Sequence, residues 1–217
     1  MTSIVVIGGG VGGLTAAIRL RVAGHAVTFV ERNPAVGGKR AVFERDGFIF
    51  DVGPSLVTLP HVFDEVVRLA GTSLDEQVAM VRLDPQFRYW WRDGSRLVVP
   101  DDPEETAAEF EAFAPGAGAQ WREFDANGRT IWDVAERTFF AGPMSGPASL
   151  LGRMESPRDL LDIDPLRTLR RAARDTFDDD HLRQWAGRYA TYSGSSPAQA
   201  PATLACIPHI ESRFGCW

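Results

Sequence analysis

The chain has 217 residues, of which 44% are hydrophobic and 24% are charged, and its formal net charge is −6. This composition is typical of a globular protein with a sizeable core, and the acidic balance disfavours a nucleic acid as partner. The two cysteines lack C-x-x-C spacing, which indicates a reducing compartment, and no apolar run reaches the roughly 18 residues that a membrane-spanning helix needs. We therefore expect a cytoplasmic protein whose membrane contact, where it has one, is peripheral and at the cytoplasmic face.

The first thirty-one residues carry the pattern of a dinucleotide-binding unit. A fully buried parallel strand, a glycine-rich turn, a helix and a second strand are predicted in this order, over residues 4–7, 8–13, 14–23 and 26–30. Gly24 stops the helix as a C-terminal cap would, and Glu31 stands at the end of the second strand. The complete order of elements favours a nucleotide site over a structural glycine turn.

The glycine spacing has a chemical reason. Gly8 allows the tight turn, Gly10 lets a pyrophosphate approach the backbone, and Gly13 lets the helix lie close to the strands. The first turn of the helix, which includes Val11 and Gly12, offers free N–H groups and a partial positive charge to the phosphates.

An acidic residue and a second glycine pair extend this site. Glu31 is spaced to accept hydrogen bonds from an adenosine ribose, and an acid there disfavours the 2′-phosphate of NADP, which leaves FAD or NAD. The doublet Gly37-Gly38 is followed by Lys39. We expect these residues and Arg32 to lie against the phosphate and ribose of the cofactor; the alternative is a simple glycine turn with solvated basic side chains.

Further signals predict a hairpin, a small antiparallel sheet and a helical region. The predicted strands cover residues 41–43 and 48–50, joined by Asp46-Gly47, and then 78–81, 87–91 and 97–99. The predicted helices cover residues 60–70, 101–140 with a break at 115–118, 158–192 with a break at 178–180, and a last segment through Ile210. A Gly/Pro/Ser-rich mobile loop is predicted at 141–157.

The segments GGGVGG, VERNPAVGGK and DGFIFDVGPSLVTLP together resemble the N-terminal portion of the FAD-dependent carotenoid desaturases, the phytoene desaturase family. The later stretch RYATYSGSSPAQAPATLACIPHIESRFGCW is similar to the middle region of that family, whose members are more than twice as long. The resemblance implies one tightly bound FAD, with Lys39 where the family more often has arginine. It also implies that a segment near the flavin ring includes Asp51, Gly53, Pro54 and Ser55, although Asp51 has the alternative role of a turn cap.

The resemblance implies an α/β fold: a Rossmann-like FAD-binding domain with a doubly wound parallel sheet, plus a partial α+β substrate domain with a helical insertion. We expect the first at residues 1–60, incomplete without a C-terminal half, and the second at 61–217, with its sheet at 78–99 and its helices at 101–212. The implied reaction removes two hydrogens from a long phytoene-like polyene to FAD. The rivals are another FAD oxidoreductase, related to amine or protoporphyrinogen oxidases, and a non-catalytic nucleotide-binding fragment.

The sequence names no catalytic residue and no metal site, because its four histidines are scattered without ligand spacing. The lipophilic polyene is the expected partner. The aromatic residues at 87–91 line either an apolar tunnel or an ordinary core. The loop at 141–157 carries apolar residues that either contact a membrane or pack onto the helices.

Overall fold

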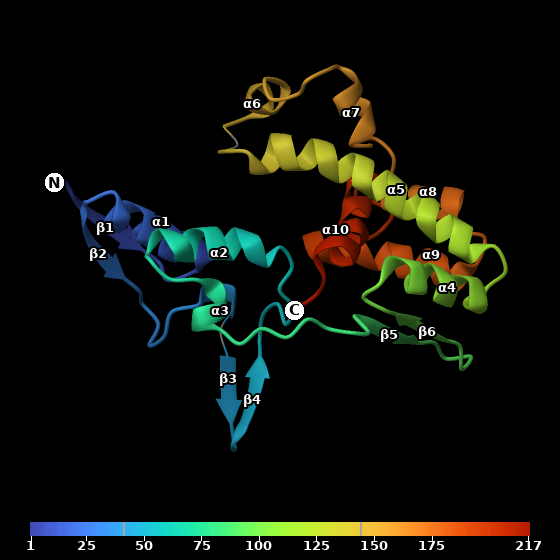
Figure 1. The fold of residues 1–217 in the computed structure, drawn as a ribbon, viewed down its shortest axis with the longest axis horizontal. Coiled ribbons are helices and arrows are strands. Elements are labelled where there is room, and N and C mark those ends of the chain that lie inside the picture. Colours follow the sequence, from blue (N-terminus) through green and yellow to red (C-terminus); the bar gives the residue numbers. More distant parts are fainter. Residues whose placement is uncertain (41, 144) are drawn as a thin grey trace. The chain divides into compact units, whose positions relative to one another are not determined.

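The computed structural model describes residues 1–40, 42–143 and 145–217. It divides into two compact units: unit 1 comprises Met1–Arg82 together with Trp217, and unit 2 comprises Leu83–Cys216. Both combine helices with short sheets, so the predicted α/β class is confirmed in this general form (Figure 1). The domain limits 1–60 and 61–217 stay a prediction. Ala41 of the predicted hairpin and Met144 of the predicted loop lie outside the described residues.

Unit 1 begins with the predicted strand–helix–strand unit. Strands β1 (Ser3–Ile7) and β2 (Ala26–Val30) are parallel, with Ser3 opposite Ala26 and Ile7 opposite Val30, and α1 (Val11–Val22) connects them. Gly24 has φ +87°, a left-handed conformation that glycine adopts without strain and that ends α1 as predicted.

The expectation that β1 is fully buried is wrong. Exposure alternates along the strand, and Ile7 is 84% exposed. Val6 lies on the side of α1, because its Cγ1 atom would be 3.7 Å from a Cβ atom built on Gly13. Burial of both faces needs a cover on each side of the sheet. In the described residues α1 packs on one side of β1, so the alternate side chains stay exposed.

The rest of unit 1 comprises a hairpin and short helices: η1 (Gly38–Arg40), β3 (Val42–Arg45), β4 (Phe48–Asp51), α2 (Pro60–Leu69) and α3 (Leu74–Gln77). Asp46 and Gly47 have φ values of 53° and 81°, so the predicted Asp-Gly turn forms with both central residues left-handed. Helix α2 begins at Pro60 as predicted.

The strand predicted at 78–81 is wrong. Ser73 and Glu76 form a capping box that starts α3, and Val78 ends this helix by donating its N–H to the carbonyl of Leu74. The apolar run from Val78 continues without helix or strand. An extended apolar segment becomes a strand only where a neighbouring strand accepts its hydrogen bonds, and none within the described residues pairs with this one.

Unit 2 contains one antiparallel sheet and a set of helices. Its elements are β5 (Phe87–Trp90), β6 (Arg96–Val99), α4 (Pro103–Phe113), α5 (Ala117–Ala135), the π-helix η2 (Glu136–Phe140), α6 (Pro147–Leu151), α7 (Arg158–Asp162), α8 (Leu169–Thr176), α9 (Asp180–Gly187), the 3₁₀ segments η3 (Arg188–Ser193) and η4 (Ala202–Ala205), and α10 (Cys206–Phe214). The long helix α5 contacts α4, α8 and α10 (Figure 1). None of the helices in the described residues has both the length and the apolar character that crossing a bilayer requires.

Two predictions for this region need correction. The predicted loop at 141–157 contains the helix α6, which starts at Pro147, a residue well suited to a first helical position. The first of the two helices predicted between 158 and 192 is interrupted, because Asp164 has φ +46° and precedes Pro165. A residue before proline disfavours the helical conformation, so α7 and α8 are separate helices.

Aromatic rings form the core of unit 2. Phe110, Phe124, Phe177 and Trp185 are buried, and the rings of Phe110 and Trp185 meet edge to face with 4.9 Å between their centroids. Along β5 and just beyond it, Phe87, Tyr89 and Trp91 pack against this core, whereas Trp90 is 64% exposed. This strand alternation favours the core interpretation over a tunnel lining.

A buried carboxylate ties the last helix of unit 2 to η3. Glu211 is 2% exposed and accepts hydrogen bonds from Arg188 (2.9 Å), Tyr189 (2.8 Å) and Tyr192 (2.7 Å). The guanidinium of Arg188 lies 4.3 Å from the ring centroids of both Phe87 and Tyr189. Three donors and two aromatic faces thus compensate the charges of a buried ion pair.

Candidate dinucleotide-binding site

The glycine loop joins β1 to α1 and is fixed to the end of β2. The N–H of Gly8 donates to the carbonyl of Val30 at 2.8 Å. A Cβ atom at position 13 would lie 1.9 Å from the carbonyl oxygen of Gly8, so only glycine fits there. Gly10 precedes α1 and provides no side-chain cap. The N–H groups in the first turn of α1, which starts at Val11 and Gly12, therefore remain available to an anion.

Glu31 lies directly against this loop. Its Oε2 atom accepts a short hydrogen bond from the N–H of Gly9. Its Oε1 atom accepts two, from the backbone N–H of Asn33 at 2.8 Å and from the side-chain amide of Asn33 at 2.7 Å. The hydrogen bonds from Asn33 and Gly9 lower the pKa of Glu31, because they stabilise its charged form. Glu31 is therefore an ionised acceptor at neutral pH.

The second glycine pair packs onto the first. The N–H of Gly37 donates to the carbonyl of Gly9 at 2.8 Å. Gly38 has φ +60°, and a Cβ atom on it would lie 2.8 Å from the Cα atom of Gly10. Two backbone segments that are distant in the sequence thus approach as closely as glycine permits.

The segment after the hairpin completes this arrangement. A Cβ atom on Gly53 would lie 1.7 Å from the carbonyl oxygen of Lys39, so these two backbones also touch. Asp51 is the last residue of β4 and pairs with Val42. The other predicted site residues in these segments are exposed, namely Arg32, Lys39, Pro54 and Ser55. The structure therefore brings the glycine loop, Glu31, the Gly37-Gly38 doublet and Gly53 together within unit 1.

Sequence reasoning missed two residues of this site. Gly9 occupies a variable position of the G-x-G-x-x-G pattern, and its importance arises only from the approach of Glu31 and Val36. Asn33 precedes Pro34, which is a turn signal. That signal predicts a turn, but it does not reveal the two hydrogen bonds from Asn33 to Glu31.

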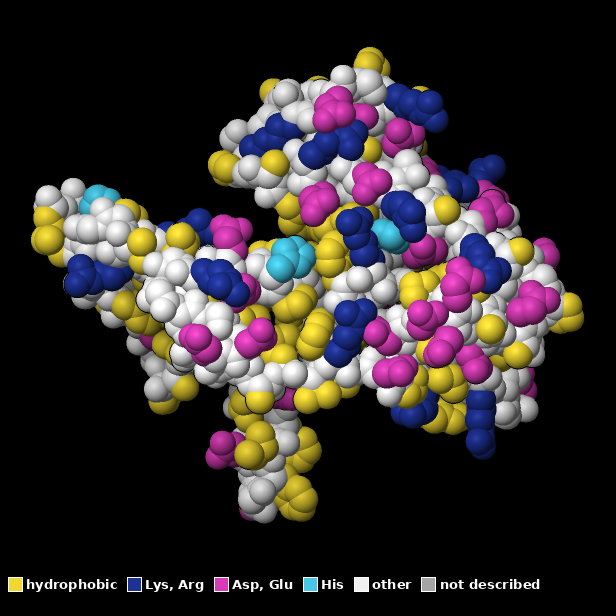
Figure 2. Space-filling view, in the orientation of Figure 1, with side chains coloured by type: hydrophobic (Ala, Val, Ile, Leu, Met, Phe, Trp, Pro, Cys, Tyr) yellow, Lys and Arg dark blue, Asp and Glu magenta, His cyan; other side chains and the backbone are white. Residues whose placement is uncertain are grey.

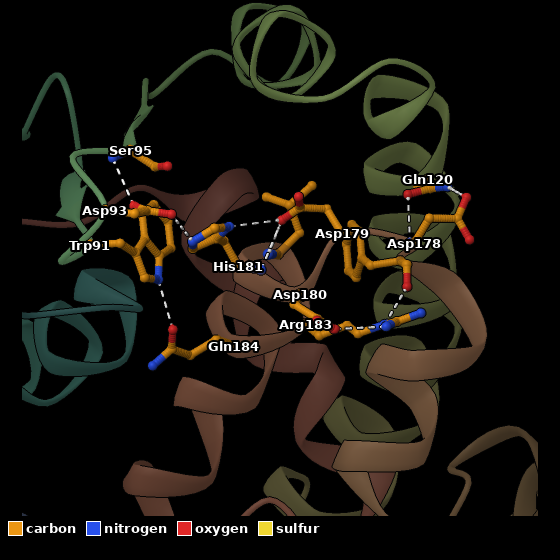
Figure 3. Close-up of polar contacts among 12 residues, drawn as sticks. Trp91, Asp93, Ser95, Gln120, Asp178, Asp179, Asp180, His181, Arg183 and Gln184 are labelled. Carbon is orange, nitrogen blue, oxygen red and sulfur yellow. Dashed lines mark hydrogen bonds and ion pairs between the residues drawn. The ribbon is translucent and has the colours of Figure 1, made fainter.

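A second polar cluster surrounds His181 in unit 2 (Figure 3). Its Nε2 atom lies 2.9 Å from Oδ2 of Asp93, and its Nδ1 atom lies 3.4 Å from Oδ1 of Asp179. Each carboxylate also accepts a backbone N–H, Asp93 from Ser95 at 2.9 Å and Asp179 from His181 itself at 2.8 Å. The hydrogen bonds that Ser95 donates contribute most to lowering the pKa of Asp93. This cluster therefore joins the β5–β6 turn to the start of α9.

No metal centre is formed in the part of the chain that the structure describes, because no three His, Cys, Asp or Glu side chains there converge as ligands. The glycine cradle of unit 1 is thus the best-formed candidate site.

The chain is similar to flavoenzymes over almost its whole length. Residues 11–196 match the family described as flavin containing amine oxidoreductase. The chain is 37% identical over 216 residues to hydroxyneurosporene desaturase of Cereibacter sphaeroides and 35% identical over 214 residues to 4,4′-diapolycopene oxygenase of Methylomonas sp. Each match covers 99% of this chain but 43% of the relative, so the chain spans less than half the length of these proteins.

Solved structures support the fold. Cyclohexylamine oxidase from Brevibacterium oxydans has a TM-score of 0.60 at 18% identity, over 100% of this chain and 45% of that one. Putrescine oxidase has a TM-score of 0.56 at 19% identity, over 95% of this chain and 41% of that one.

The resemblance to the carotenoid desaturases is confirmed by the two enzymes named above. Of the two cofactors that the sequence left open, FAD and NAD, the match to a flavin-containing family supports FAD. The backbone cradle agrees with this cofactor, since its close glycine contacts leave the N-terminus of α1 open to a pyrophosphate. By the match over residues 11–196, the chain belongs to the flavin containing amine oxidoreductase family.

Proposed function

We propose that this chain is the FAD-binding and partial substrate-binding portion of an enzyme that desaturates a long, phytoene-like carotenoid precursor. The observation that carries the proposal is the glycine cradle with Glu31 against it, in a chain that is 35–37% identical, over 99% of its length, to a hydroxyneurosporene desaturase and a diapolycopene oxygenase. Both relatives have long polyene substrates in their names, which favours a polyene over an amine.

FAD, when bound, would supply the redox chemistry: it would accept a hydride from one carbon of a C–C single bond, the neighbouring carbon would lose a proton, and the bond between them would become double. The task of this chain is to bind and orient it. We assign the pyrophosphate to the backbone of Gly8, Gly10, Gly13 and the N–H groups of Val11 and Gly12. Glu31 would hold the adenosine ribose.

The remaining site residues follow along the cofactor. We assign Arg32 and the Gly37-Gly38-Lys39 turn to its phosphate and ribose portion, with the lysine as a point charge rather than a bidentate donor. Asp51, together with Gly53, Pro54 and Ser55, would pass near the flavin ring. The contact of Gly53 with the backbone of Lys39 supports treating both segments as one surface.

We further propose that β1 and β2 belong to a larger, doubly wound parallel sheet. In this proposal residues 1–60 form part of the FAD domain and residues 61–217 form part of the substrate domain. The support is the exposure of apolar side chains on β1, where Val5 is 61% exposed and Ile7 84%. Further strands and a second covering layer would bury them.

A polyene substrate dissolves in lipid, and unit 2 has a segment suited to a peripheral contact with the cytoplasmic face of a membrane. Around α6 and α7, Leu151 is 56% exposed, Leu161 75% and Leu166 94%. Arg158 on the same segment lies 3.5 Å from Asp162 and is 82% exposed, so its guanidinium could also contact an anionic lipid. Figure 2 shows hydrophobic and basic side chains beside each other at this edge of unit 2.

The membrane proposal is tested by sedimentation with anionic vesicles. The double change Leu161→Ser and Leu166→Ser should reduce the bound fraction, whereas Leu69→Ser, at a residue 41% exposed in unit 1, should not. Equal binding by all variants would contradict the contact.

The enzymatic proposal is tested on this chain joined to the remaining portion of the hydroxyneurosporene desaturase. With FAD and polyene in liposomes, we expect a product with a longer conjugated system, visible as a shift of its absorption to longer wavelength. The 217 residues alone should form none, because an incompletely enclosed site admits water. Oxidation of amines without any polyene product would favour the amine oxidase alternative.

A further inference from the structure

Glu31 is held in one orientation before any cofactor binds. A carboxylate has about four positions at which it accepts hydrogen bonds, two on each oxygen. Both positions on Oε1 are used by Asn33, through its backbone N–H at 2.8 Å and its side-chain amide at 2.7 Å. By hydrogen-bond geometry Oε2 accepts one partner among the described residues, the N–H of Gly9. The backbone N–H of Arg32 makes the smallest of the contributions that lower the pKa of this carboxylate. The acceptor position that remains open is therefore on Oε2, next to the glycine loop.

We propose that Asn33 is a positioning residue for the adenosine ribose, which saturates Oε1 of Glu31 and so presents Oε2 as the single acceptor for one ribose hydroxyl. The inference rests on the proposed FAD site and deepens it, because it assigns a selective role to a residue outside the glycine motif.

The packing around Gly9 supports this orientation. A Cβ atom on Gly9 would lie 2.8 Å from Oε2 of Glu31 and 3.1 Å from Cγ1 of Val36. The carboxylate thus occupies space that any larger residue at position 9 would take. The hydrogen bonds from Asn33 and Gly9 also lower the pKa of Glu31, so the oriented group is the charged form, which is the stronger acceptor.

The role of Asn33 is tested by combining one substitution in the protein with nucleotides that each lack one ribose hydroxyl. The 217-residue chain and its Asn33→Ala variant are titrated by calorimetry with ADP, 2′-deoxy-ADP and 3′-deoxy-ADP, which share the pyrophosphate and differ in the ribose hydroxyls. We expect Asn33→Ala to weaken ADP binding about three- to tenfold, the range for one hydrogen bond that loses its geometry. One of the two deoxy analogues should bind both proteins equally, since it lacks the hydroxyl that Oε2 accepts.

Two further variants distinguish a positioning role of Asn33 from a general loss of folded protein. Asn33→Asp keeps the backbone N–H but replaces the amide donor with a second negative charge, so it should weaken ADP at least as much as Asn33→Ala. Asn127→Ala, which removes an amide in unit 2, should change no affinity. Because each ratio of ADP to a deoxy analogue is measured within one protein, a change in the folded fraction cancels.

Each outcome of these titrations either supports or overturns the role of Asn33. Equal weakening of ADP and both deoxy analogues by Asn33→Ala would overturn the inference and leave the FAD site intact. Absence of ADP binding by the unaltered chain would overturn the cofactor site itself and the inference with it. A loss confined to ADP and one deoxy analogue would confirm that Asn33 acts through the ribose.

Discussion

The two units of this chain bury their apolar residues to very different degrees. Unit 2 has a closed aromatic core that includes Phe110 and Trp185, and a buried ion pair at Glu211. Among the described residues 1–82, Gly9 alone is fully buried, and the hairpin exposes Phe48 (65%) and Ile49 (70%), as Figure 2 shows for its hydrophobic side chains. The residue that unit 1 buries best is therefore part of its glycine loop. Unit 2 is built around an aromatic core, and unit 1 around this loop.

The largest expected effect lies in the core of unit 2. Glu211→Gln removes the charge that compensates Arg188, which remains largely buried between two rings. Breaking a buried pair by removing one partner costs about 3–5 kcal/mol, so we expect unit 2 to lose most of its stability. Hydrogen exchange should show the loss in unit 2 and not in β1 or β2. The exposed Glu109→Gln on α4 is the matched control, and equal effects of both variants would argue against the buried pair.

A smaller effect is expected in the glycine loop of unit 1. Gly13→Ala places a Cβ atom 1.9 Å from the carbonyl of Gly8, and overpacking of this kind costs about 1–3 kcal/mol. FAD binding should be lost as well, because the loop must move. Gly12→Ala meets no atom within 4 Å and should leave the fold of α1 unchanged in thermal unfolding. If Gly13→Ala were as stable as Gly12→Ala, the close approach would be wrong.

Glu31→Ala should weaken cofactor binding and leave the pairing of β1 with β2 intact. Loss of a charge-assisted hydrogen bond to the ribose corresponds to about 1–3 kcal/mol of binding free energy. Glu31 follows the last residue of β2, so the strand pairing does not depend on its side chain. The pKa of Glu31 is lowered, so its charge is lost only as the pH falls below the ordinary glutamate range, and FAD affinity should be constant at neutral pH. An unchanged affinity in the variant would refute the ribose assignment.

The smallest effect is expected at His181. Asp93 and Asp179 keep their backbone hydrogen bonds when the imidazole is removed, and partly exposed polar contacts of this kind contribute about 1 kcal/mol or less. His181→Ala should therefore lower the melting temperature of unit 2 only slightly. A loss as large as that of Glu211→Gln would show that the β5–β6 turn depends on this cluster.

Local signals predicted the local structure well. The Asp46-Gly47 turn, the end of α1 at Gly24 and the start of α2 at Pro60 follow from the conformational preferences of those residues. The strand predicted at 78–81 failed because pairing depends on a distant partner. The contact of Glu31 with Gly9 spans 22 residues, and that of Glu211 with Arg188 spans 23, so no periodicity reveals either.

The most direct test of the central claim is a titration of the 217-residue chain with FAD and with NAD. Quenching of flavin fluorescence monitors the binding of FAD, and calorimetry monitors the binding of both cofactors. We predict saturable FAD binding that Gly13→Ala abolishes, and no comparable NAD binding. NAD binding without FAD binding, or FAD binding that is unchanged in Gly13→Ala, would contradict the assignment of the glycine cradle to a flavin cofactor.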